Sequence, residues 1–291
     1  MRTLIFVFFL SIVCPTQVFT QETSVKSEKR VYKTVNGNEL KVDIFYSTIT
    51  KQKMNNPAIA FFHGGGWVYG DPSEFYGACE RYAAKGFVTF SFQYRLSINE
   101  DETYPHPDIT PIESVKDARS AIRWLRENAE SLKINPEKIV VGGQSGGGHL
   151  AWATALFDSI NEKTDNMKIS STPDAILLYS SCYNTMEAWV DNLLGDRRDQ
   201  IWSISPYHNL KSGLPPALAF HGNSDCMVLY YTVLFFMDKM RELGNPIELV
   251  TLEGRDHYLG EGNEKYSGYF DEEILERTDE FLESIGFMPK E

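Results

Sequence analysis

Hydrophobic residues are arranged in two alternating patterns along this chain: short uninterrupted runs, and longer stretches spaced by three or four positions. A run such as 58–62 is typical of a strand buried on both faces of a sheet. The clearest helical pattern is at 112–130, where Val115, Ala118 and Ile122 share one face and charged residues lie opposite. The chain therefore alternates between predicted strands and predicted amphipathic helices.

The predicted elements suffice to assign a fold class. Strands are expected at 31–35, 39–47, 58–62, 87–94, 138–142, 175–180, 217–221 and 246–252. Helices are expected at 74–85, 112–130, 146–157, 228–243 and 269–285. The first two strands should form an antiparallel pair, and the alternation that follows predicts an α/β fold, with a mostly parallel, twisted sheet and helices on both faces.

One turn in this pattern carries a candidate nucleophile. The strand at 138–142 leads into Gly143-Gln144-Ser145-Gly146-Gly147, and the helix at 146–157 follows at once. A serine on so sharp a strand-to-helix turn is exposed above the end of the sheet, and the flanking glycines leave room for the close backbone. The pattern predicts that Ser145 is a catalytic nucleophile.

A second glycine-rich turn follows the run at 58–62 and reads His63-Gly64-Gly65-Gly66-Trp67. Backbone N–H groups without a neighbouring Cβ can point at the negative charge that develops on a carbonyl oxygen under attack. We expect Gly65 and Gly66, together with Gly146, to form such an oxyanion hole. An ordinary turn after a strand would look similar, but the serine turn in the same chain favours the oxyanion hole.

A serine nucleophile needs a histidine base and an acid that orients it. His221 and His257 both follow predicted strands, where open α/β sheets place their chemistry. In α/β-hydrolases the partners come in the order serine, acid, histidine, and Ser145, Asp225 and His257 satisfy that order. His221 is then expected to hold the loop that carries Asp225.

Other acids and histidines are weaker candidates. Glu253 and Asp256 are rival acids, but Asp256 is the immediate neighbour of His257 and cannot easily meet the edge of its ring. His63 is expected to hydrogen-bond the glycine turn to neighbouring backbone. His149 lies one turn further along the helix than the nucleophile, so its ring should not reach the hydroxyl.

These motifs resemble those of the α/β-hydrolase superfamily serine esterases, close to the hormone-sensitive-lipase-like group and to bacterial carbohydrate esterases of the acetyl-xylan or feruloyl esterase type. The resemblance rests on the glycine turn and on residues 93–97, 143–151, 221–225 and His257. It implies an α/β-hydrolase fold and ester hydrolysis without a cofactor or metal ion. Gly146 departs from the alanine common after the nucleophile in the hormone-sensitive-lipase-like group, but it keeps the N–H donor.

Charge and the N-terminal segment narrow the partners and the location. The formal net charge of -12 and the lack of a basic cluster argue against nucleic acid or an anionic membrane surface as partner. Residues 1–20 place a short apolar run behind one positive charge, which predicts a signal peptide and leaves 21–291 as a single catalytic domain. The protein is therefore expected to be secreted or periplasmic, with lipid anchoring at Cys14 as a less favoured alternative. The oligomeric state stays open.

Substrate preference is suggested by aromatic residues and by the absence of a long apolar lid before the nucleophile. We expect a small or absent cap, with Trp67 and Tyr69 bordering the acyl pocket. The connection at 182–214 carries aromatic and polar residues, which suit a sugar ring or an aromatic acyl group, although the loop could also pack on itself. We expect hydrolysis of short acetyl or feruloyl esters on polysaccharide. A prolyl-oligopeptidase-type exopeptidase, a general short-chain carboxylesterase or lipase, and a binding protein on a hydrolase scaffold remain alternatives.

Two further expectations concern the core. Trp124 and Trp152 are expected to pack inside the protein. Cys182 and Cys226 follow neighbouring predicted strands, so they either pair in a disulfide or remain buried free thiols.

Overall fold

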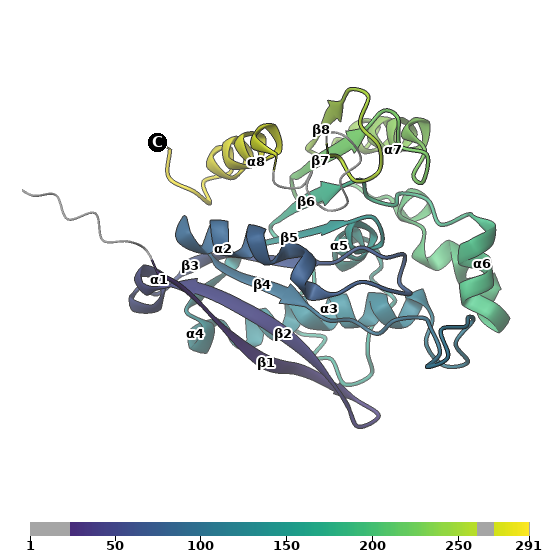
Figure 1. Ribbon diagram of the computed structural model, residues 1–291, viewed down its shortest axis with the longest axis horizontal. Coiled ribbons are helices and arrows are strands. Elements are labelled where there is room, and N and C mark those ends of the chain that lie inside the picture. The colour runs from purple at the N-terminus through teal and green to yellow at the C-terminus, as the bar shows by residue number, and fades with distance from the viewer. Residues whose placement is uncertain (1–23, 261–270, 291) are drawn as a thin grey trace, which may run out of the picture.

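A computed structural model describes residues 24–260 and 271–290 and contains one eight-stranded sheet (Figure 1). The strands are β1 (Val25–Val35), β2 (Asn38–Ser47), β3 (Asn56–Phe62), β4 (Val88–Phe92), β5 (Ile134–Gln144), β6 (Ala175–Tyr179), β7 (Ala217–Gly222) and β8 (Ile247–Leu252). Their order is β1-β2-β4-β3-β5-β6-β7-β8. β1 and β2 are antiparallel to their neighbours, and the other six strands are parallel. The predicted fold class is confirmed. The predicted signal peptide and Cys14 lie outside the described residues.

Helices cover both faces of this sheet. They are α1 (Thr48–Gln52), α2 (Tyr76–Ala84), α3 (Pro111–Glu127), α4 (Ala129–Leu132), α5 (Gly146–Leu156), α6 (Ala188–Leu194), α7 (Tyr230–Glu242) and α8 (Glu272–Ser284). One buried cluster packs α2 and α8 against the sheet, and a second, larger one packs α3, α5 and α7 against the opposite face. The predicted helix at 269–285 begins partly outside the described residues.

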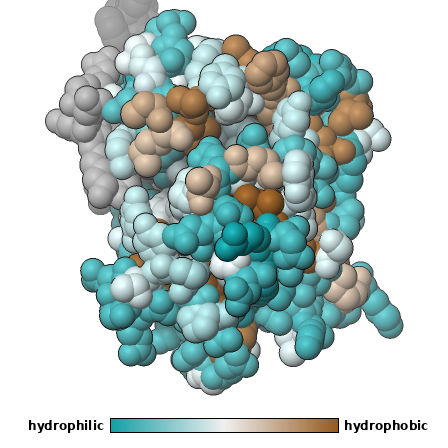
Figure 2. Space-filling view, turned by 90° about the vertical axis from the view of Figure 1, so that its right-hand side faces the viewer, coloured by the Kyte–Doolittle hydropathy of each residue, from teal (hydrophilic) through white to brown (hydrophobic). Residues whose placement is uncertain are grey.

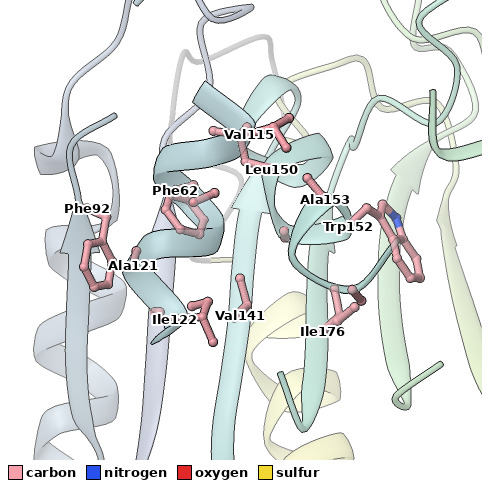
Figure 3. Close-up of a cluster of buried hydrophobic side chains, with 14 of the residues drawn as sticks. Phe62, Phe92, Val115, Ala121, Ile122, Val141, Leu150, Trp152, Ala153 and Ile176 are labelled. Carbon is pink, nitrogen blue, oxygen red and sulfur yellow. The ribbon is translucent and has the colours of Figure 1, made fainter. Parts of the chain in front are cut away.

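The larger cluster fixes the helix that follows the predicted nucleophile. Side chains of α3 and α5 meet those of the central strands in Figure 3, where Ile122 and Leu150 face Phe62 and Val141. All four are fully buried. Each such side chain contributes about 1.5–3 kcal/mol through burial. Trp152 is also fully buried, as expected, and the partly buried Trp124 packs against the same core.

The start of α3 shows how sequence sets an element boundary. Thr110 caps the helix by accepting a hydrogen bond from the N–H of Ile112, and Glu113 accepts one from the N–H of Thr110 at 2.9 Å. Pro111 occupies the first helical position, where a missing N–H costs nothing. The predicted helix at 112–130 ends earlier, because Asn128 leaves helical geometry and separates α3 from α4.

The strongest differences from the predicted elements lie in the edge strand β1 and in the connection between β6 and β7. β1 begins at Val25 rather than near residue 31. The sequence pattern did not predict this first half, because most of it is exposed and has no apolar alternation. Residues 182–214, predicted as a loop, contain α6 and the short 3-10 turns Gly195–Ile204 and Pro206–Asn209. This segment lies on the right of Figure 1 and forms a small cap.

Candidate active site

Ser145 occupies the turn between β5 and α5 in a strained conformation, with φ 51° and ψ -117°. A positive φ in a residue other than glycine costs about 1–3 kcal/mol, so it persists only where the surrounding structure holds it. Here the N–H of Ser145 donates to the carbonyl of Tyr179 at 3.0 Å, and its own carbonyl accepts from the N–H of Cys182 at 3.2 Å. A Cβ on Gly147 would lie 2.1 Å from the carbonyl oxygen of Phe62, so only glycine allows this packing.

The predicted oxyanion-hole glycines lie beside this turn. Gly65 and Gly66 have φ of +97° and +58°, and no hydrogen bond among the described residues uses their N–H groups. Gly146 begins α5, where the N–H has no partner within the helix. A Cβ on Gly146 would lie only 3.2 Å from the nitrogen of Gly66. The three glycines line one pocket together with Ser145.

Asp225 and His257 meet as an acid and an imidazole. His257 Nδ1 donates to Asp225 Oδ2 at 2.8 Å, and His221 Nε2 lies 3.1 Å from the same oxygen. Asp225 Oδ1 accepts from the N–H groups of Met227 and Val228, each at 2.8 Å. Burial alone would raise the pKa of Asp225, but the hydrogen bonds from the two histidines and Val228 hold that pKa below its ordinary value. His221 thus holds the Asp225 loop, as expected.

The two rival acids lie elsewhere. Glu253 accepts a hydrogen bond from the side chain of Asn223, and Asp256 accepts one from the N–H of Tyr258 at 3.0 Å. Neither carboxylate hydrogen-bonds to His257 among the described residues. The geometry therefore pairs His257 with Asp225.

Ser145 and His257 line the same cavity of about 970 Å³. Within the described residues, however, no hydrogen bond joins the Ser145 hydroxyl to the imidazole. The side-chain amide of Gln144 lies there instead, with its Nε2 3.1 Å from His257 Nε2. Gln144 was not predicted as a functional residue, and its place directly before the nucleophile was the only sequence signal.

Aromatic rings form one wall of the cavity, which includes both predicted pocket residues. Trp67 is fully buried and stacks on Trp189, with ring centroids 5.4 Å apart. Trp189 also closes over the glycine turn, since a Cβ on Gly66 would lie 2.9 Å from its ring. Tyr69 is 52% exposed at the same cavity. The wall therefore has a rigid inner part and an open outer part.

Charge in the cavity is acidic. Apart from the titratable His257, the charged residues among its described lining are Glu102 and Glu187. Glu187 accepts a hydrogen bond from the indole N–H of Trp189 at 2.8 Å. The acidic lining agrees in sign with the formal net charge of -12.

Two other histidines are structural. His63 Nδ1 lies 2.9 Å from the carbonyl oxygen of Gly64, and His149 Nε2 donates to the carbonyl of Ile204 at 2.6 Å, which ties α5 to the cap. Burial lowers the pKa of each to about 4. Both imidazoles are therefore neutral at neutral pH.

These histidines predict an acid-sensitive fold. In the unfolded chain a histidine takes up a proton near pH 6.5, but in the folded chain His63 and His149 do so only near pH 4. Their contribution to the free energy of unfolding is therefore complete above pH 6.5 and is lost as the pH falls from 6.5 to 4. It amounts to about 3 kcal/mol for each histidine.

Urea unfolding between pH 4.5 and 7 should show this loss. His149→Gln should reduce the slope; a slope equal to that of the unaltered protein would contradict the assignment.

The structure decides between the two alternatives for Cys182 and Cys226. Cys182 and Cys226 are free thiols; Cys182 is buried, which raises its pKa to about 12, whereas Cys226 is exposed. The structure thus has no disulfide here, and the alternative of a buried thiol is wrong for Cys226.

Residues 24–260 and 271–290 contain no group of three or more histidine, cysteine or acidic side chains that could hold a metal ion, and no helix there is long and apolar enough to cross a membrane.

Sequence comparisons relate this chain to known esterases and lipases. The BD-FAE family matches residues 42–240. Lipase 2 of Moraxella sp. (strain TA144) is 26% identical over 80% of this chain and 60% of its own length. Esterase LipC of Mycobacterium tuberculosis is 25% identical over 69% of this chain and 52% of its own length. The chain therefore spans between half and two thirds of these curated relatives.

Comparison with solved structures extends the match to nearly the whole chain. The apo form of Thermogutta terrifontis esterase 2 is 34% identical, covers 91% of this chain and 97% of its own, and superposes with a TM-score of 0.81. Its propionate-bound form gives the same TM-score and identity, with 91% and 96% coverage. The resemblance to hormone-sensitive-lipase-type esterases is confirmed, and the chain belongs to the BD-FAE family of α/β-hydrolase serine esterases.

Proposed function

We propose that this protein is a carboxylic ester hydrolase that removes short acyl groups, acetyl or feruloyl, from polysaccharide. The observation that carries the proposal is the hydrogen bond from His257 to Asp225, with His257 lining one cavity together with Ser145, Gly65 and Gly66, whose N–H groups are unpaired among the described residues. Thermogutta terrifontis esterase 2 has been solved with propionate and with butyrate, which supports a short acyl group.

The proposed mechanism is a two-step acyl transfer. Ser145 Oγ attacks the ester carbonyl while His257 Nε2 takes its proton, and Asp225 orients the imidazole and stabilises its charged form. The N–H groups of Gly65, Gly66 and Gly146 hold the oxyanion. His257 then protonates the departing alcohol. In the second step His257 takes a proton from water, which attacks the acyl-enzyme, and then returns it to Ser145 Oγ as the acid is released.

The open part of the cavity suits a carbohydrate alcohol. Tyr69 and Trp189 offer partly exposed aromatic faces, against which the apolar face of a sugar ring can pack. Glu102 and Glu187 offer carboxylate oxygens, which accept hydrogen bonds from hydroxyl groups. Aromatic faces beside acceptors therefore support a neutral, hydroxyl-rich alcohol.

The test is a panel of acetyl, butyryl, octanoyl and feruloyl esters measured beside acetylated xylan. The proposal expects the highest kcat/KM for acetyl or feruloyl esters and release of acetate from the xylan. Equal rates at every acyl length, or no acetate from xylan, would contradict it. An aminoacyl-p-nitroanilide should not be cleaved, since the named relatives are esterases and lipases rather than peptidases.

The charge of the cavity leads to a separate prediction. An acetyl ester whose alcohol carries a free carboxylate should have a kcat/KM about 5–10-fold below that of its neutral counterpart, because Glu102 and Glu187 repel it. Glu187→Gln should raise the rate on the anionic ester only, and added salt should do the same. The matched control is the exposed Glu39→Gln, which should change neither rate; equal rates on both esters would exclude this electrostatic selection.

A second candidate, a short-chain lipase, is supported by an apolar patch near the cavity. The patch consists of exposed residues from α7 and the turn before it: Met227, Leu229, Tyr231, Leu234 and Phe235. Hydrophobic surface gathers in the upper half of Figure 2, at the height where Figure 1 places α7. Met227 also lines the cavity. A rise in rate on tributyrin above its solubility limit would favour this candidate over the carbohydrate esterase.

The proposed location follows from the sequence alone. A signal peptide at residues 1–20 would direct the protein to the periplasm or the medium. N-terminal sequencing of the mature protein should find a start near Gln21. A mature protein that retains Met1 would contradict this proposal.

A further inference from the structure

Gln144 is enclosed between the two halves of the candidate site. Its side chain is almost fully buried, at 2% exposure. Its Oε1 lies against the glycine turn, since a Cβ on Gly64 would come within 1.9 Å of it. Its Nε2 lies 3.1 Å from His257 Nε2. The side chain thus lies between Gly64 of the glycine turn and the proposed base.

The hydrogen-bonding groups define the state of the imidazole. An amide nitrogen can only donate, so His257 Nε2 must be the acceptor and carries no proton. The Asp225 carboxylate can only accept, so His257 Nδ1 carries the proton. This is the neutral tautomer that a general base requires. In the absence of a hydrogen bond from the Ser145 hydroxyl, the amide of Gln144 is the described group that satisfies the Nε2 lone pair.

We propose that Gln144 is a positioning residue that keeps His257 neutral and holds its Nε2 lone pair toward the cavity until the nucleophile takes over that contact. The inference rests on the proposed function, because it assigns His257 as the base. A donor to the lone pair favours the uncharged imidazole, so replacing Gln144 should change the pH dependence of the reaction. Gly64 is part of this device, because any side chain there would displace the amide.

The test compares two variants of similar size, Gln144→Glu and Gln144→Met. A carboxylate accepts rather than donates and favours the charged imidazole, so the acid limb of the kcat/KM profile of Gln144→Glu should move up by about one pH unit. Methionine removes the donor without adding charge, so its acid limb should move in the same direction by about half as much. At pH values above the limb, Gln144→Glu should regain most of its rate.

The control is Gln93→Met, since the side chain of Gln93 accepts a hydrogen bond from the N–H of Lys41, away from the cavity. Its pH profile should match that of the unaltered protein. If Gln144 only filled space, both Gln144 variants would lose rate equally at every pH. Acid limbs that stay in place in both Gln144 variants would overturn the proposal.

A readout without substrate separates this inference from the proposed function. The His257 ring can be titrated by NMR in histidine-labelled protein, and its midpoint should move upward in Gln144→Glu whether or not any ester is hydrolysed. A protein that hydrolyses no ester but shows this movement would refute the proposed function, while the effect of Gln144 on the His257 imidazole would stand. A midpoint that is the same in the unaltered protein and both variants would refute the positioning role alone.

Discussion

Ser145→Ala is expected to lower kcat on a soluble acetyl ester by about four to six orders of magnitude, because no other group can form the acyl-enzyme intermediate. His257→Ala should cost about as much, since the hydroxyl is a poor nucleophile without its base. The double variant should be no worse than either single one, because the members of such a unit do not contribute independently. Initial rates over several hours with highly purified protein would check all three.

The matched control for this experiment is Ser180→Ala. Ser180 follows the neighbouring strand β6, and its buried hydroxyl has no hydrogen-bond partner in the part of the chain that the structure describes. Because its hydroxyl does not line the cavity, the variant should keep nearly full activity. A folded Ser145→Ala protein that retains more than about one per cent of kcat would contradict the assignment of the nucleophile.

Asp225→Asn is expected to lower kcat by about two to four orders of magnitude. The neutral amide no longer stabilises the imidazolium, and it can present an N–H to His257 Nδ1 and so select the wrong tautomer. The Asn carbonyl can still accept the N–H groups of Met227 and Val228, but an amide nitrogen then meets His221 and His257 in place of a carboxylate oxygen, so the variant should also lose about 1–3 kcal/mol of unfolding free energy. Kinetics and urea unfolding on the same preparation separate the two effects.

Asp256→Asn is the natural control, since its carboxylate accepts the N–H of Tyr258 and makes no hydrogen bond to His257 among the described residues. Its kcat should stay within a few fold of the unaltered protein. If Asp256→Asn were the inactive variant and Asp225→Asn the active one, the pairing of acid and base would have to be reassigned.

The central sheet and the cluster of candidate catalytic residues could be predicted from sequence because each depends on a local signal. Fully buried strands such as β3 and β6 read as apolar runs, and a parallel sheet brings the loops after its strands to one edge. Ser145, Asp225 and His257 all lie on loops that follow parallel strands, so the fold class alone predicts that they lie close together. The glycine turn carried its own signal through three consecutive glycines.

Other features depend on distant contacts and left no comparable signal. The first half of β1 is held by backbone pairing with β2, while most of its side chains are exposed. The cap helix α6 is only seven residues long and packs through Val190 and Leu193, in a stretch too short for a clear helical pattern. The contact of Gln144 with His257 joins residues 113 positions apart. No spacing rule for the nucleophile turn could foresee it.

The most direct test of the central claim is to inactivate the protein with a fluorophosphonate and map the modified peptide by mass spectrometry. The account predicts one adduct on Ser145 in proportion to lost activity, with slow labelling in His257→Ala and none in Ser145→Ala. An adduct on another residue, or complete labelling of Ser145→Ala with the same loss of activity, would show that the nucleophile lies elsewhere.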